Sequence, residues 1–186
     1  MSLRAKNNSA SRRFGSKHIF EITLFAMLGA LMYASKLLME VLPNIHLLAM
    51  FITVFTVVFR AKALYPIYVF VFLTGLYAGF GAWWPPYLYV WTVLWAIVML
   101  LPKNMPTPVA CIVYSLVAGL YGLLFGVLYA PGQALIFGYT FDQMLAWIAS
   151  GFVFDVIHGI SNLVIGFLSV PLIKVTKRAL HATGMY

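Results

Sequence analysis

Long apolar stretches dominate the chain, and short polar or turn-forming stretches separate them. Because the apolar runs are continuous and do not alternate with period two, they predict helices rather than the strands of a barrel. Each crossing of a bilayer needs roughly 20 apolar residues. The pattern predicts an all-α membrane protein with six transmembrane helices, at about 19–42, 45–59, 63–81, 87–101, 109–129 and 143–173.

The polar stretches divide the chain and mark its turns. The longest connection is expected at 130–142, which contains Pro131 and Gly138. The last apolar stretch is longer than one crossing needs, so a break at Gly151 or a projection above the bilayer is expected. Three parts result: a basic cytoplasmic segment at 1–18, a membrane domain at 19–173 and a cytoplasmic tail at 174–186.

Basic residues lie almost entirely on one side of the predicted spans. The three opposite connections contain no Lys or Arg, and only Lys36 falls inside a span. Because cytoplasmic loops are enriched in Lys and Arg, both termini are predicted to be cytoplasmic. The residues that form this pattern are Arg4, Lys6, Arg12, Arg13, Lys17, Arg60, Lys62, Lys103, Lys174, Lys177 and Arg178.

Composition narrows the class of protein. The chain is 63% hydrophobic and 9% charged, whereas a soluble domain carries about 25% charged residues. Its net charge of +8 is explained by topology and by affinity for anionic lipid, so no nucleic-acid partner is expected. A phosphate loop, a zinc-binding His pair and a nucleophile elbow are all absent from the sequence. We therefore expect no catalytic residue, no metal and no cofactor.

Two groups of polar residues lie inside the predicted spans. Asp155, His158 and Asn162 share one face of the last span, and an intramembrane acid normally faces a cavity or the protein interior. They could form the floor of a ligand pocket or a structural hydrogen-bond network, and structure is favoured for Asp155 and Asn162. Lys36 lies one turn from Glu40, so it could form a local ion pair or contact a ligand.

Aromatic, amide and imidazole side chains gather at the connections predicted on the outer face. Aromatic rings often anchor a protein at the membrane interface, which is the alternative for any one of them. Others could stack on a planar ligand. Without a cation in the loops, the face would suit a largely neutral ligand with many hydrogen-bonding groups. The candidate ligand contacts are Lys36, Asn44, His46, Trp84, Tyr87, Tyr89, Trp91, Gln133, Tyr139 and His158.

Small residues recur every four positions in the first span. Ala26, Ala30 and Ala34, with Gly29 beside them, place small groups on one helix face. Such a face lets another helix approach closely, either inside the bundle or in a partner.

The chain resembles the substrate-binding S components of energy-coupling factor (ECF) vitamin transporters, a class of ATP-binding cassette importer. The resemblance extends over nearly the whole chain and is carried by the alanine repeat, Pro43–Leu47, Trp83–Trp91 and Phe154–Asn162. It implies a multi-pass protein of a prokaryotic plasma membrane that binds a vitamin at its outer face. It also implies docking through Ala26, Ala30 and Ala34 onto a transmembrane coupling subunit, whose two ATPase partners hydrolyse ATP.

The resembled subfamily implies cobalamin as the transported ligand, which agrees with a wide, neutral, aromatic face. Pantothenate is the alternative, because its carboxylate would need a cation and Lys36 is the only candidate. Folate and queuosine precursors follow. Two other classes stay open: a membrane-embedded enzyme, for which only Asp155 and His158 approach a suitable pair, and a structural subunit without a ligand.

Overall fold

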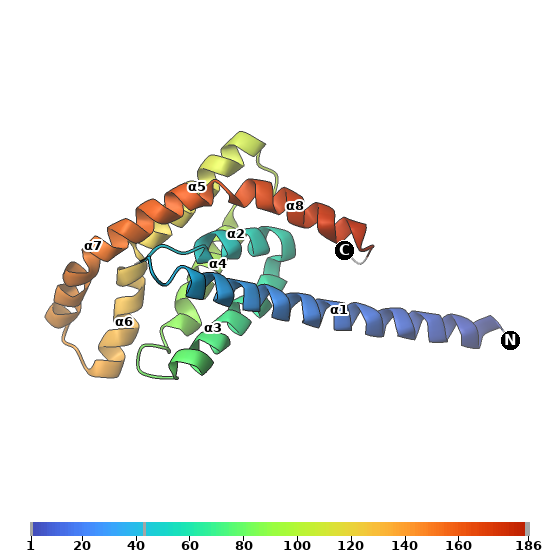
Figure 1. Cartoon of the computed structure of the whole chain (residues 1–186), viewed down its shortest axis with the longest axis horizontal. Helices are drawn as coiled ribbons and strands as arrows, with labels where there is room; N and C mark the ends of the chain where they lie inside the picture. The colour runs from blue at the N-terminus through green and yellow to red at the C-terminus, as the bar shows by residue number, and fades with distance from the viewer. Residues whose placement is uncertain (1, 43, 185–186) are drawn as a thin grey trace.

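A computed structural model of the protein describes residues 2–42 and 44–184, with side chains from residue 17 onward. The described chain is helical and contains no strand (Figure 1). The side chains of Arg4, Lys6, Arg12 and Arg13 and the whole of Pro43 lie outside the described residues. The elements are α1 (Ser2–Leu38), α2 (Leu48–Phe59), η1 (Arg60–Ala63), α3 (Leu64–Ala78), α4 (Tyr87–Leu100), α5 (Thr107–Leu123), α6 (Phe125–Phe137), α7 (Phe141–Gly166) and α8 (Ser169–Ala182).

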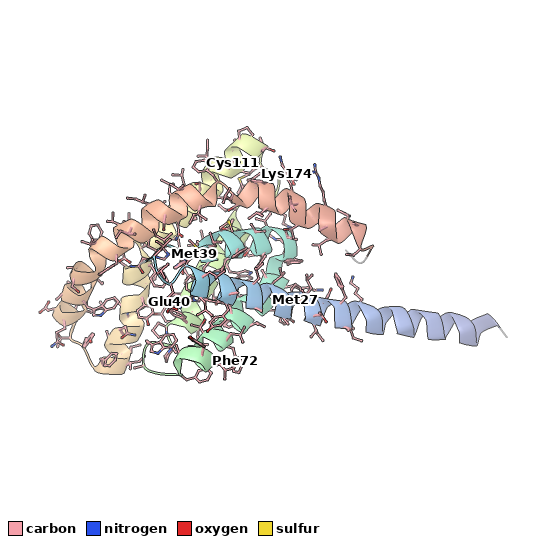
Figure 2. All side chains as sticks on the ribbon, in the orientation of Figure 1. Met27, Met39, Glu40, Phe72, Cys111 and Lys174 are labelled. Carbon is pink, nitrogen blue, oxygen red and sulfur yellow. The ribbon has the colours of Figure 1, made fainter. Side chains whose placement is uncertain are left out.

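Four helical segments within the described residues are long and apolar enough to cross a membrane, and α4 is a shorter apolar helix. Large apolar side chains project outward from these segments, such as Met27, which is 66% exposed, and Phe72, which is 55% exposed (Figure 2). Such exposure is unfavourable in water over a large surface but not in lipid. The long segments are Lys17–Leu38, Leu48–Ala78, Thr107–Phe137 and Phe141–Gly166.

Two of the long segments are bent. Arg60 has a φ of 55°, a left-handed conformation that ends α2 before η1 and α3 begin. Leu124, with a φ of −97°, separates α5 from α6. The 12 residues of α2 and the 14 of α4 rise about 18 Å and 21 Å at 1.5 Å per residue. Each is shorter than the roughly 30 Å hydrocarbon core of a bilayer.

The core of the molecule is built around α2. No residue of this helix is exposed, and it packs against α4 and α8 and, to a smaller extent, against α5, α7 and α1. Its two threonines are satisfied internally, since Thr53 Oγ1 donates to Ala49 O at 2.8 Å and Thr56 Oγ1 donates to Ile52 O at 2.6 Å. Because neighbouring helices cover α2, its length need not match the thickness of the bilayer's hydrocarbon core.

The most extensive helix contact joins α5 and α7, and glycines bring the two backbones together there. A Cβ atom on Gly122 would lie 2.8 Å from His158 O and 2.9 Å from Gly159 N. A Cβ atom on Gly159 would lie 3.1 Å from Gly119 O. Small residues at this contact permit the two helices to approach closely.

Two details predicted from the sequence are wrong. The stretch 130–142 is not a long loop, because α6 continues through Pro131 to Phe137 and ends where Gly138 adopts a φ of 68°. Its apolar sequence favours helix despite the proline, which membrane helices tolerate. Nor does Gly151 break the last helix: α7 is continuous to Gly166, and the chain bends only before α8.

Candidate ligand-binding site

A cavity of about 190 Å³ lies where the chain turns from α1 to α2. Met39 and Glu40, which follow the last residue of α1 (Figure 2), form part of its wall. Six of the ten ligand contacts expected from the sequence meet here: Lys36, Asn44, His46, Tyr87, Trp91 and His158. Met39, Glu40, Leu42, Ile45, Leu48 and Phe125 complete the lining.

The turn between α1 and α2 places His46 in this cavity. Asn44 has a φ of 57°, in the left-handed region that asparagine tolerates better than most residues. Its carbonyl oxygen accepts a hydrogen bond from Ser161 Oγ of α7 at 3.3 Å. The turn is thereby tied to the helix that carries His158.

Imidazole and aromatic rings form the inner wall. The ring centroids of His46 and His158 are 4.6 Å apart with an interplanar angle of 70°. Phe125 contacts His158 edge to face at 5.1 Å, and Trp91 contacts His46 at 6.1 Å. Tyr87 lies one turn before Trp91 on α4, with their centroids 5.5 Å apart. The wall therefore combines flat apolar surface with ring nitrogen atoms.

Three of these ring nitrogens are buried and make no hydrogen bond within the described part of the protein: His46 Nδ1, Trp91 Nε1 and His158 Nε2. Leaving a buried polar atom without a partner costs about 1–3 kcal/mol. Deeper in α7, both amide atoms of Asn162 are in the same condition. Unsatisfied atoms gathered around one cavity are available to hydrogen-bond water or a polar ligand.

Lys36 brings a positive charge to the cavity, and Glu40 brings a negative one. Its Nζ atom lies 3.9 Å from Glu40 Oε1, with the two side chains 26% and 63% exposed. The local ion pair expected from the sequence is therefore present, but an exposed pair at this distance stabilises the protein little. Among the described lining residues Lys36 is the only lysine or arginine. The cation-free connections predicted a site without a cation, but the cavity contains this one.

His46 is neutral at pH 7. Burial, and to a smaller extent the charge of Lys36, lowers its pKa from 6.5 to about 4. A neutral imidazole offers one donor and one acceptor nitrogen. His46 can therefore form hydrogen bonds with a ligand across the physiological pH range without changing its charge.

The depressed pKa of His46 predicts acid sensitivity. Between pH 6.5 and about 4 the unfolded chain binds a proton that the folded site rejects, so the stability of the fold falls as the pH falls through this window. Lys36, Glu40 and His158 are the other titratable groups around it. Thermal unfolding in detergent should show a smaller loss between pH 6.5 and 5 for His46→Gln than for the wild type; equal losses would contradict the assignment.

Four expected ligand contacts lie outside the cavity, and three of them bond to the backbone. Trp84 Nε1 donates to Val71 O at 2.9 Å. Gln133 Nε2 is 3.4 Å from Ala82 O.

Tyr89 joins α4 to α6, since its hydroxyl donates to Leu128 O at 2.8 Å and accepts from Gly132 N at 3.2 Å. Tyr139 stacks on Phe137, with centroids 5.7 Å apart. These side chains hold the connections around the site in place.

The structure also shows the surroundings of Asp155 and of the alanine face of α1. Asp155 Oδ1 accepts a hydrogen bond from Gly126 N at 3.1 Å, so this intramembrane acid joins α7 to the start of α6. Ala26, Ala30 and Ala34 are exposed on α1, while the neighbouring Gly29 is buried against α3, where a Cβ atom would meet Val69 at 2.5 Å. The alanine face is therefore not used for packing against the described part of the chain.

Six lining residues were not among the expected ligand contacts, and Phe125 is the one that contributes an aromatic ring. It lies at the start of α6, inside a stretch that the sequence predicts as one uninterrupted span. Nothing in the sequence distinguishes an apolar residue there from one that faces lipid. No protein family model, curated protein or solved structure matches the chain. The proposed function therefore depends on the cavity and on the residue patterns of the sequence.

Proposed function

We propose that the chain is the membrane-embedded, substrate-binding subunit of a vitamin importer, an S component of the ECF type. The observation that carries this proposal is the cavity between α1, α4 and α7, where Lys36 and three unpartnered ring nitrogens surround one small volume. A structural subunit would have no need to leave these atoms unsatisfied. Among the described lining residues, Glu40 is the only acid that accompanies the two histidines, and there is no cysteine or serine. An enzymatic reaction therefore has little support.

The size and charge of the cavity support pantothenate over cobalamin as the ligand. Its volume of about 190 Å³ is below the 300–1,000 Å³ of sites for drug-sized molecules, whereas a corrinoid exceeds that size. Lys36 would pair with a carboxylate, and the neutral imidazoles and indole N–H would bond hydroxyl and amide groups. A small carboxylate with several hydrogen-bonding groups is therefore the ligand class we propose.

The remaining parts of the proposal concern topology and partners. Six crossings would use α1, α2, α3, α4, α5 with α6, and α7, with both termini cytoplasmic and α8 on the cytoplasmic side. The exposed Ala26, Ala30 and Ala34 would then be available to a transmembrane coupling subunit, and two ATPase subunits would supply the energy. The concentration of basic residues at one end supports this orientation.

Calorimetry of the purified protein against pantothenate, cobalamin, folate and riboflavin tests the proposal. We expect pantothenate to bind most tightly and Lys36→Gln to weaken it about tenfold or more, because a charge-assisted bond contributes about 1.5–3 kcal/mol. Stability should change little, since the exposed pair is worth under about 1 kcal/mol.

Glu40→Gln is the matched control. It breaks the same ion pair but leaves the lysine, so it should preserve binding. Undiminished binding by Lys36→Gln would exclude the carboxylate contact, and no binding of any of the four compounds would refute this vitamin-binding assignment.

A further inference from the structure

A second polar cavity lies at the opposite ends of α2 and α4 from the ligand-binding site. Its volume is about 210 Å³, and Val57 and Val98 form its apolar wall. Arg60, Lys103 and Lys177 form its polar side, together with Asn104 and Tyr114. We call it the basic cavity.

The three cations of the basic cavity come from three separate parts of the fold. Arg60 follows the last residue of α2, Lys103 lies in the connection 101–106 and Lys177 lies on α8. The cavity is therefore assembled by tertiary structure and is not a run of basic residues along one helix. Bringing three like charges to one small volume is unfavourable unless opposite charge is supplied.

No acidic side chain supplies that charge. The four acidic residues are Glu21, Glu40, Asp142 and Asp155, and none of them lines the basic cavity. Glu21 pairs with Lys62 at 2.7 Å, and Glu40 pairs with Lys36. Within the described residues no anionic side chain neutralises the basic cavity, so its cations are available to an anionic ligand.

Arg60 is held in a defined position within this cavity. Its Nη2 atom donates to Met99 O at 3.0 Å, and its carbonyl oxygen accepts from Trp95 Nε1 at 3.1 Å. Its φ of 55° is an uncommon conformation for a residue other than glycine, and residues held in this way concentrate at functional sites. One guanidinium nitrogen is anchored, and the remaining N–H donors are left for a ligand.

We propose that the basic cavity binds a phosphate group. The arginine fork matches phosphate oxygens in pairs, and lysine adds a mobile point charge. Two lysines, the Tyr114 hydroxyl and the Asn104 amide complete a set of donors around a multivalent oxyanion. The phosphate can belong to the headgroup of an anionic phospholipid, which attracts basic residues at the membrane surface, or to soluble inorganic phosphate. This inference does not depend on the vitamin-binding proposal.

The test compares Arg60→Gln/Lys177→Gln with the wild type and with Lys174→Gln. Lys174 is an exposed lysine on the same helix as Lys177, but it lies on the outer side of α8 and does not line the cavity (Figure 2). Two measurements separate the sources of phosphate. Calorimetry in neutral detergent uses inorganic phosphate, and native mass spectrometry measures phosphatidylglycerol retained from vesicles mixed with phosphatidylcholine.

We expect the double variant to weaken phosphate or phosphatidylglycerol binding about tenfold or more, since it removes two charge-assisted contacts. Lys174→Gln should change the same binding less than about twofold. Retention of phosphatidylglycerol without affinity for inorganic phosphate would identify a lipid headgroup, and the reverse result would identify soluble phosphate. Either result supports the basic cavity as a phosphate site.

Lys103→Gln in the exposed connection provides a second variant that leaves the helices intact, and it should weaken binding about fivefold. Equal losses in Lys174→Gln and the cavity variants would show diffuse surface attraction and overturn the proposal. Absence of both phosphate and phosphatidylglycerol binding in the wild type would overturn it as well.

Discussion

Gly122→Leu is expected to force α5 away from α7 and to destabilise the protein severely. A Cβ atom at this position would lie within 2.9 Å of two backbone atoms of α7, His158 O and Gly159 N. Backbone cannot rotate out of the way as a side chain can, so the helices must separate. Overpacking of a well-packed contact costs about 1–3 kcal/mol or more, and we expect this substitution to reach or exceed the upper end.

Thermal unfolding in detergent, together with the fraction of monodisperse protein, measures this effect. Gly151→Leu is the matched control, because Gly151 lies on α7 with open space around it. It introduces the same side chain into the helix that faces Gly122 and should leave stability unchanged or slightly higher, since leucine favours helix over glycine. Equal behaviour of the two variants would show that the α5–α7 glycine contact is not close in the protein.

His158→Phe is expected to separate stability from binding. Phenylalanine keeps a flat ring between His46 and Phe125 but removes Nε2, a buried atom without a partner. The ligand-free protein should therefore gain about 1 kcal/mol of stability, while binding of the ligand found by calorimetry should weaken about ten- to hundredfold. Such opposite changes are typical of sites that sacrifice stability for function.

Ser169→Ala is the control for this experiment. Ser169 Oγ is also buried and without a hydrogen bond within the described residues, but it lies outside the cavity. Its replacement should raise stability without altering binding. If His158→Phe bound the ligand as well as the wild type does, His158 would have only a structural role.

Hydrophobic patterning predicted the helical class and the positions of α2, α3 and α4 closely, because turn-forming residues and cations mark their ends. Asn44, His46, Tyr87 and Trp91 were expected at the site because they lie near connections at one end of the helices, and Lys36 because it is the only basic residue inside a predicted span. Trp84 and Gln133 lie at the same end but bond to backbone carbonyls. Residue type and position along a helix do not distinguish a side chain that faces the cavity from one that hydrogen-bonds to a nearby backbone carbonyl.

The glycine contact and Phe125 could not be found in the same way. A glycine in an apolar run is equally compatible with open surroundings, as at Gly151, and with backbone contact, as at Gly122. Which one applies depends on the rotation of α5 and α7 about their axes. The division of 107–137 into α5 and α6 was missed because its apolar residues continue across Leu124, so hydropathy gives no sign of the bend that brings Phe125 to the cavity.

The enclosure of α2 by its neighbours has a consequence for how the surrounding lipid can act on the protein. A change in bilayer thickness acts on helices that lipid touches, and α2 presents no exposed residue to it. The 22 residues of Lys17–Leu38 and the 26 of α7 rise about 33 Å and 39 Å, so in a bilayer with a core of about 30 Å they must tilt. Lys36 and His158 are on those helices, whereas Leu48 begins the enclosed one. Ligand affinity should therefore vary with the acyl-chain length of the host membrane, because hydrophobic mismatch moves one wall of the cavity relative to the other.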